Sequence, residues 1–217
     1  MKLLSLVSLA VLSQTVSAHY IWNTLIAGDT TSSAAVRMPQ SNSPVTDVTS
    51  DDIRCNVNPS PATETVDVAA GSTIGFKLDN TLYHQGPAAI YLGSAPSDVS
   101  SWDGSGTNWF KIAEWGAEFD PFSFTDYNLS ELTATIPAAT PSGQYLARIE
   151  QTGLHVTGAP QWYISCAQIN VTGGGSGSPT KVSIPGYVSP DDPGLTVNIY
   201  DPVPTAYTVP GPSPWTG

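Results

Sequence analysis

The chain has 217 residues, with seven basic and 18 acidic side chains and a formal net charge of −11. This length favours a single domain with a sizeable core. The acidic balance argues against nucleic acid or an anionic membrane as a partner, because few cations are present to neutralise phosphates. Glycine and proline number 19 each, which predicts many turns and leaves little room for a helical core.

Residues 1–18 have the pattern of an export signal. Lys2 provides the positive end, an apolar run extends from Leu3 to Leu12, and Val16-Ser17-Ala18 forms a small-residue cleavage site. The apolar run is too short to span a bilayer, and no later segment reaches 18 consecutive apolar residues. We therefore expect a secreted, extracellular protein whose single domain, residues 19–217, begins at His19.

Short runs of β-branched and aromatic residues follow one another along this domain and are separated by turn residues. The predicted strands are 66–68, 73–78, 88–92, 109–115, 132–136, 144–150, 162–171 and 195–200. No window sustains an apolar period of 3.6 residues, which argues against long helices. The pattern predicts an all-β fold, an immunoglobulin-like or fibronectin-like β-sandwich with long loops.

Two further patterns are typical of exported proteins. Cys55 and Cys166 are the only cysteines, so in an oxidising compartment they can pair only with each other. Closing a loop of roughly 110 residues would remove about 4 to 5 kcal/mol of denatured-state entropy, and two free buried thiols are the alternative. Asn128-Leu129-Ser130 and Asn170-Val171-Thr172 match the acceptor pattern for N-glycosylation.

The chain contains only three histidines, and one of them directly follows the predicted cleavage site. A free N-terminal His19 offers two nitrogen donors, its ring and an α-amine whose pKa of about 7.7 to 8.0 lets a metal displace the proton. One more imidazole, from His84 or His155, would complete a three-nitrogen set that suits Cu(II). The alternative is a coincidence of the cleavage site and two ordinary histidines.

Polar residues flank the other two histidines. His84 opens the turn His84-Gln85-Gly86-Pro87, which can hold an imidazole rigidly at a sheet edge. Gln161 and Tyr163 are two apart in a predicted strand, so they project from the same face, and Arg148 and Glu150 do so in the preceding strand. We expect one polar face from these four side chains, with His155 in the intervening loop; a solvent-facing sheet edge is the alternative.

Several segments occur in an order that is similar to one known family. They are His19 after the export signal, 52–56 (DIRCN), 84–87 (HQGP), 148–150 (RIE), 154–155 (LH), 161–168 (QWYISCAQ), 198–200 (NIY) and 207–212 (YTVPGP). Each segment is weak evidence alone, but the ordered set spans the mature chain. It resembles the fungal lytic polysaccharide monooxygenases of auxiliary activity family nine, formerly classed as a glycoside hydrolase family.

The resemblance implies a centre with one copper ion. Copper would be held by the amine and ring of His19 and by the ring of His84, with Tyr163 as a distant axial neighbour. His155, Gln161 and Tyr163 would form the catalytic surroundings, where His155 and Gln161 hydrogen-bond to the oxygen co-substrate. Arg148 and Glu150 would support this network.

The resemblance also implies the reaction and its partners. The expected activity is oxidative cleavage of glycosidic bonds in cellulose or a related β-1,4-glucan, driven by a reductant or electron-transfer protein with O2 or H2O2. We expect a monomer with a flat copper-bearing face on which Tyr20 and Tyr207 stack on sugar rings. The segment 77–83 lacks an insertion seen in many members that act at C4, which favours C1 oxidation.

Two other classes of function are compatible with parts of the sequence. A glycoside hydrolase would need a carboxylate pair from Glu114, Glu118, Asp120 and Glu150, but nothing fixes two of them at a working separation. A secreted copper-binding or polysaccharide-binding protein without turnover would use the same histidines. The additional polar residues favour an enzyme, because metal storage does not require them.

Overall fold

Short strands joined by turns and long loops make up most of the computed structural model, which describes residues 19–217. The predicted export signal, residues 1–18, lies outside the described residues. The strands are β1 (Trp22–Ala27), β2 (Thr30–Ser32), β3 (Val36–Arg37), β4 (Val66–Ala69), β5 (Thr73–Leu78), β6 (Ala88–Ser94), β7 (Thr107–Trp115), β8 (Ala117–Phe119), β9 (Phe122–Phe124), β10 (Glu131–Thr135), β11 (Gly143–Gly153), β12 (Gln161–Thr172) and β13 (Val182–Ser183). A 3-10 turn, Asp51–Ile53, and a one-turn helix, α1 (Pro193–Thr196), complete the described elements, and no helix among them is long and apolar enough to span a membrane.

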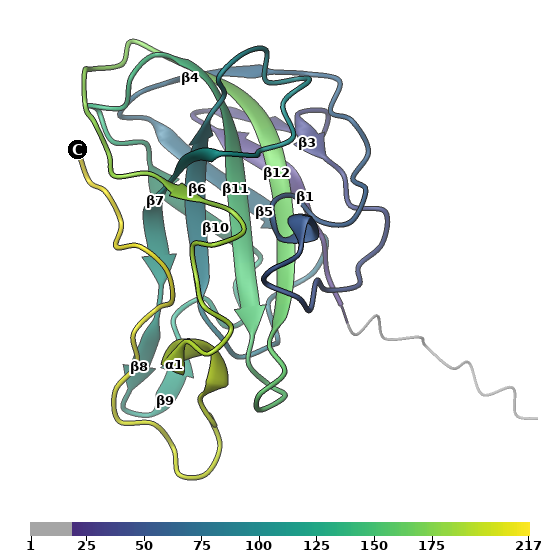
Figure 1. Ribbon diagram of the computed structural model, residues 1–217, viewed down its shortest axis with the longest axis vertical. Coiled ribbons are helices and arrows are strands. Elements are labelled where there is room, and N and C mark those ends of the chain that lie inside the picture. The colour runs from purple at the N-terminus through teal and green to yellow at the C-terminus, as the bar shows by residue number, and fades with distance from the viewer. Residues whose placement is uncertain (1–18) are drawn as a thin grey trace, which may run out of the picture.

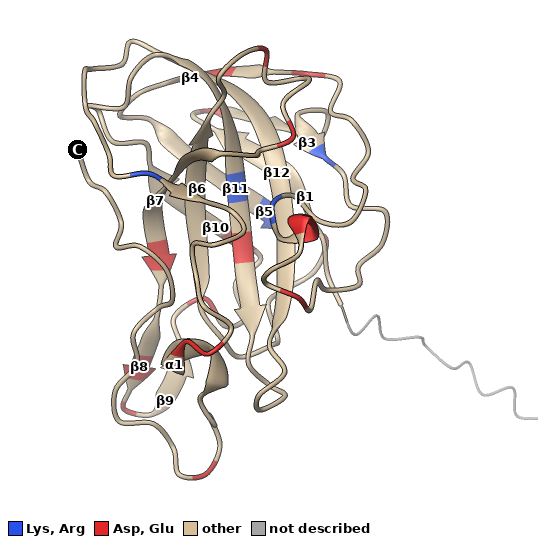
Figure 2. Ribbon diagram, viewed as in Figure 1, with Lys and Arg blue, Asp and Glu red and all other residues tan. Residues whose placement is uncertain are grey.

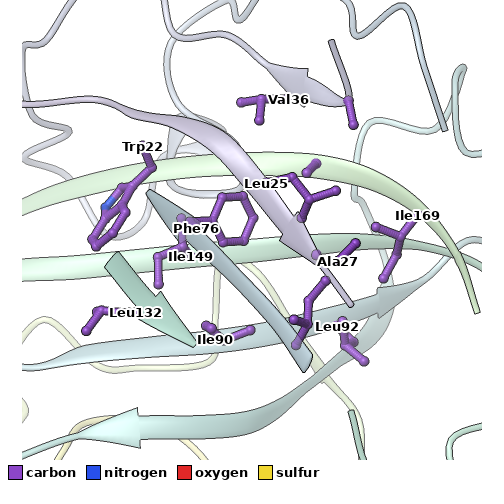
Figure 3. Packing of buried hydrophobic residues seen from close by; sticks show 14 of the residues in the cluster. Trp22, Leu25, Ala27, Val36, Phe76, Ile90, Leu92, Leu132, Ile149 and Ile169 are labelled. Carbon is purple, nitrogen blue, oxygen red and sulfur yellow. The ribbon is translucent and has the colours of Figure 1, made fainter. Parts of the chain in front are cut away.

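Two sheets form a sandwich. The smaller sheet has the order β10-β5-β1-β2, and the larger has the order β13-β7-β6-β11-β12-β3, with β4 parallel to β12. The long strands β11 and β12 run along most of the height of the molecule (Figure 1). Leu25 and Phe76 from the smaller sheet pack against Ile90 and Ile149 from the larger (Figure 3). The predicted all-β sandwich is confirmed.

Most of the predicted strands are confirmed, but the prediction missed β1 and five short strands, β2, β3, β8, β9 and β13, and it placed one strand wrongly. Strand β1 is missing from the prediction because a register shift between Trp22 and Thr24 breaks its alternation against β5. The predicted strand 195–200 is wrong. Asp192 accepts a hydrogen bond from the Gly194 amide, 2.8 Å, and Pro193 occupies the first turn of α1. An N-cap aspartate and a first-turn proline favour the start of a helix, and here they override the β-propensity of the residues that follow.

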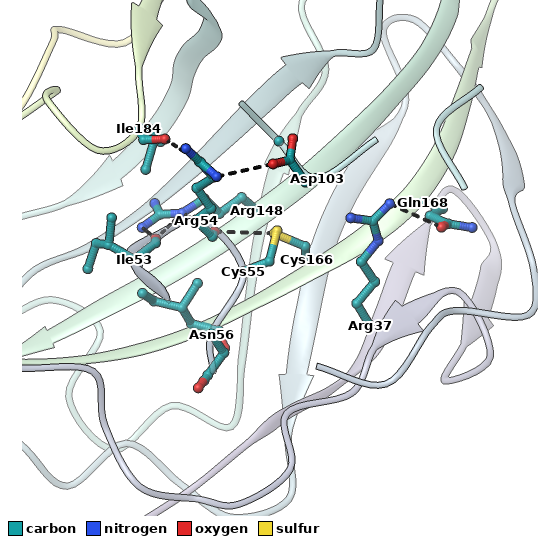
Figure 4. The surroundings of a disulfide bond; sticks show 12 residues. Arg37, Ile53, Arg54, Cys55, Asn56, Asp103, Arg148, Cys166, Gln168 and Ile184 are labelled. Carbon is teal, nitrogen blue, oxygen red and sulfur yellow. Dashed lines mark hydrogen bonds and ion pairs between the residues drawn. A yellow bond between two sulfur atoms is a disulfide. The ribbon is translucent and has the colours of Figure 1, made fainter. Parts of the chain in front are cut away.

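Loops cover the outer face of the larger sheet and bury a second apolar cluster there. The predicted disulfide between Cys55 and Cys166 is present and ties one of these loops to β12, with Cα atoms 5.2 Å apart (Figure 4). The buried Arg148 guanidinium donates from Nη2 to the Ile53 carbonyl, 2.8 Å, and from Nε to the Arg54 carbonyl, 2.8 Å. The covalent bond and the guanidinium therefore hold the same loop.

Candidate metal centre

All three histidines meet at the end of the sandwich where β11 turns into β12, the lower end in Figure 1. His19 precedes β1, His84 precedes β6, and His155 lies in the loop between β11 and β12. The ring centroids of His19 and His84 are 6.1 Å apart. The His84 and His155 rings stack with centroids 3.9 Å apart and planes at 13°. Tertiary structure thus brings together residues that are separated by 136 positions, from 19 to 155.

The turn that carries His84 is docked on β11 by its own backbone. The Leu154 amide donates to the Gln85 carbonyl, 2.8 Å, and Gln151 Nε2 donates to the His84 carbonyl, 3.1 Å. Gly86 has a φ of +153°, and a Cβ there would lie 1.8 Å from the Thr152 carbonyl oxygen. Only glycine fits at this position, so the turn holds His84 against the sheet as the sequence predicts.

His155 sits in a space that a neighbouring glycine leaves open. A Cβ at Gly153 would lie 3.0 Å from His155 Nδ1 and 3.3 Å from His84 Cβ. The Tyr200 hydroxyl donates to the His155 carbonyl, 3.1 Å, and holds its backbone. Burial, together with the nearby His19, lowers the pKa of His155, which favours the neutral form of its ring. Sequence reasoning missed Gly153 and Tyr200, although Tyr200 lies in one of the matching segments.

Two tyrosines pack beneath the histidines. The Tyr163 ring lies 5.9 Å from that of His19 and 5.5 Å from that of His84, centroid to centroid. Its hydroxyl donates to Gln161 Oε1, 2.9 Å, so these two side chains share a face as predicted. Tyr20 is 2% exposed and its ring is 4.4 Å from that of Tyr163. The prediction that Tyr20 is a surface residue for sugar stacking is therefore wrong.

The predicted polar face with Arg148 and Glu150 is also wrong. In the antiparallel register, Arg148 lies opposite Cys166 and Glu150 opposite Ile164, whereas Gln151 lies opposite Tyr163. Directly paired residues project from the same face, so Arg148 and Glu150 face the outer loops instead of the histidines.

The residue that reaches the histidines from β11 is Gln151. Its Oε1 accepts the Tyr20 hydroxyl, 2.6 Å, while its Nε2 donates to the His84 carbonyl. Gln151 is fully buried and connects the residue beside His19 to His84 itself. Sequence reasoning missed it because the register between the two strands decides which β11 side chains share the face of Tyr163.

The remaining candidate residues, Tyr207, Asn128 and Asn170, lie outside the histidine cluster. Tyr207 is half-buried in the C-terminal loop, where its hydroxyl donates to the Gly194 carbonyl, 2.9 Å, and its ring meets Phe124 edge-on at 5.1 Å. Asn128 is exposed in a turn with a φ of 65°. Asn170 is half-buried in β12, and its Nδ2 donates to Asp67 Oδ1, 2.7 Å.

The histidine pair has a separation that fits one shared metal ion. With metal–nitrogen bonds of about 2 Å, two imidazoles on opposite sides of an ion place their ring centroids roughly 6 Å apart. The observed 6.1 Å between His19 and His84 agrees with this value. Within residues 19–217 no group of three or more His, Cys, Asp or Glu side chains can share an ion. A third strong donor would be the α-amine of a chain that begins at His19.

Comparisons with known proteins agree with this geometry. The Auxiliary Activity family 9 model (formerly GH61) matches residues 19–207. The chain is 49% identical to AA9 family lytic polysaccharide monooxygenase H of Malbranchea cinnamomea, with all of both chains covered. It is 47% identical to AA9 family lytic polysaccharide monooxygenase E of Podospora anserina, covering 97% of this chain and 73% of that protein.

The fold is also that of solved monooxygenase structures. A cellulose-active polysaccharide monooxygenase from M. thermophila superposes with a TM-score of 0.81 at 29% identity, covering 92% of this chain and all of that one. Fold and site thus define an oxidative polysaccharide-cleaving β-sandwich enzyme. The chain belongs to Auxiliary Activity family 9 and is a lytic polysaccharide monooxygenase, an enzyme that needs a reductant and O2 or H2O2.

Proposed function

We propose that the protein is a copper-dependent enzyme that oxidises cellulose at C1 of the glycosidic bond. The observation that carries this proposal is the pair of imidazoles, His19 and His84, at the spacing of a shared ion and surrounded by His155, Gln161 and Tyr163. C1 oxidation is supported by the short segment 77–83 before His84, which lacks the insertion seen in many C4-acting relatives.

One copper ion would be held by the His19 ring, the His84 ring and the His19 α-amine, with the Tyr163 phenol nearby. Copper bound here would accept one electron from an external donor and would activate O2 or H2O2. Burial raises the pKa of Tyr163 well above its ordinary value, so its hydroxyl keeps its proton and donates a hydrogen bond to Gln161 Oε1. A neutral phenol is a weak, distant neighbour and leaves the strong bonds to nitrogen.

His155 and Gln161 would orient the oxygen co-substrate. Gln161 Oε1 already accepts the Tyr163 hydroxyl, so the NH2 group of this amide is the end that can donate outward. The neutral His155 ring has one donor and one acceptor nitrogen, and Nδ1 has no hydrogen-bond partner within the described residues. His155 can give or accept a proton beside the histidine pair, and Gln161 can donate a hydrogen bond there.

The charge around the site suits an uncharged polymer. Three segments near the histidines, 79–87, 112–126 and 186–217, contain acidic residues but neither Lys nor Arg, and a fourth, 153–161, contains no charged residue. Figure 2 shows this acidic character on β8 and beside α1. Cellulose carries no charge and therefore meets no repulsion there. Tyr200, which is 56% exposed, and the half-buried Tyr207 offer aromatic surface for sugar rings.

We further propose that the mature protein is a secreted monomer whose one catalytic domain, residues 19–217, begins at His19. The family model supports this start, because its match begins at residue 19. The disulfide supports an oxidising, extracellular location.

Product analysis tests the proposed reaction. Copper-loaded protein that begins at His19 is incubated with amorphous cellulose, with and without ascorbate, and the soluble sugars are analysed by mass spectrometry. We expect aldonic acids only with ascorbate. Native oligosaccharides released without reductant would indicate hydrolysis, and bound copper without oxidised sugars would indicate a binding protein without turnover.

A further inference from the structure

One buried carboxyl group near the site lacks any partner. Asp126 is 1% exposed, and neither Oδ1 nor Oδ2 makes a hydrogen bond within residues 19–217. The other strongly buried carboxylate, Glu150, is 6% exposed and accepts bonds from Arg148, 2.7 Å, and Tyr187, 2.7 Å. A buried ionised carboxylate without a partner is costly, so Asp126 requires a separate explanation.

The turn that contains Asp126 is bonded to both sides of His84. The Asn128 amide donates to the Leu82 carbonyl, 2.7 Å, and the Leu82 amide donates to the Leu129 carbonyl, 2.8 Å. On the other side, the Phe124 amide donates to Gln85 Oε1, 3.1 Å. Residues 124–129 therefore form a frame beside residues 82–85, and this frame carries the buried Asp126 side chain.

The groups that face this carboxyl are phenols, not cations. Asp126 contributes to raising the pKa of Tyr20 and of Tyr207, which places it near both rings, and burial is the larger cause for each. Burial raises the pKa of Asp126 to about 8, against a smaller lowering by its own backbone amide, and no described Lys, Arg or His contributes to this shift. Both phenols keep their protons far above this value, so Asp126 is the first group of this set to ionise as the pH rises. Glu114 and Asp192, which also act on Tyr207, add negative charge and oppose that ionisation.

We propose that Asp126 is a positioning residue for His84: its uncharged carboxyl is packed inside the 124–129 frame, and its ionisation opens the frame and releases residues 82–85. A bare carboxylate would have to reach water, so the turn that carries Asp126 would move and its backbone bonds to Leu82 would break. The role toward a metal ligand rests on the proposed function, whereas the coupling between the carboxyl and the frame does not.

Hydrogen exchange of the metal-free protein tests the coupling. Protection of peptides covering 82–87 and 124–130, corrected for the intrinsic pH dependence of exchange, should fall about tenfold or more between pH 6 and 9.5 in the wild-type protein. It should stay constant in Asp126→Asn, which cannot ionise. Glu118→Gln removes an exposed carboxylate from the neighbouring hairpin and should behave like the wild type. A pH-independent wild type, or an equal fall in Asp126→Asn, overturns the proposal.

A second measurement needs no variant. Carboxyl-carbon NMR of protein labelled at aspartate should show one resonance that titrates close to pH 8, and titration of every aspartate near pH 4 would overturn the proposal.

Calorimetry with Cu²⁺ alone separates the role of Asp126 from the proposed copper-dependent function. Absence of tight copper binding to the mature wild-type protein contradicts the proposed function, while the exchange and NMR results decide the role of Asp126 independently.

Discussion

The imidazoles of His84 and His155 stack at 3.9 Å, although one belongs to the turn before β6 and the other to the loop after β11. The contact exists because Gly153 has no side chain in the space between the two residues. The His84 ring lies 6.1 Å from that of His19, centroid to centroid, and this spacing supports the proposal that His84 holds the metal while His155 acts on the co-substrate.

A side chain at Gly153 should displace His155. In Gly153→Ala the new Cβ would lie 3.0 Å from His155 Nδ1, which is too close for an ordinary contact. We expect turnover on cellulose to fall about 10- to 100-fold, because displacement of a group by roughly 1 Å can cost that much, while copper affinity changes less than about threefold. Gly116→Ala, whose Cβ would meet only a Val209 methyl group at 3.2 Å, is the control. Unchanged turnover in Gly153→Ala would show that the stacked position of His155 is not needed for the reaction.

The assigned roles of His84 and Gln161 separate binding from catalysis. His84→Ala should abolish tight copper binding, since it removes one of two imidazole donors. Gln161→Ala should retain copper but lose turnover by roughly 10- to 100-fold, the effect expected for residues that act beside a metal. Titration calorimetry with Cu²⁺ and product yields measure the two effects. Unaltered affinity in His84→Ala would show that the metal assignment is wrong.

The pair Arg148–Glu150 should matter for stability and not for the metal. Glu150→Gln leaves the guanidinium of Arg148, which is fully buried, without its counter-ion. We expect a loss of about 3 to 5 kcal/mol in the free energy of unfolding, measured by urea denaturation. Glu131→Gln breaks the exposed pair with Lys77 and should cost less than about 1 kcal/mol. Arg148 and Glu150 face away from the histidines in the β11–β12 register. If Glu150→Gln had wild-type stability but lost most of its copper affinity, that result would contradict this register.

Asp126 should make stability fall as the pH rises. Its pKa is about 8 when folded, above the ordinary 3.8, so between these values the folded state keeps a proton that the unfolded state has released. Its contribution is complete below about pH 4 and is lost towards pH 8, with a limiting slope of about 1.4 kcal/mol per pH unit. Asp126→Asn should flatten this slope in urea midpoints measured at pH 4, 6 and 8. Parallel curves for the two proteins would refute the assignment.

Local sequence was sufficient for the features that depend on neighbouring residues or on simple counts. Alternating side chains predict strands such as 73–78, which the structure has with the same bounds. Two cysteines allow one disulfide, and a spacing of two predicts the shared face of Gln161 and Tyr163. The turn at His84 follows from its own Gly and Pro residues.

The sequence by itself therefore determined most of the longer strands, the disulfide and the set of histidines. Tertiary structure decided that Gln151, instead of Arg148 and Glu150, lies on the face of the histidines, and that Tyr20 is buried beneath them. Alternation assigns sides within a strand, but the register between strands follows from loop closure and core packing, and a shift of one residue exchanges the two faces. For the same reason the space at Gly153 and the burial of Asp126 exist only in the folded chain.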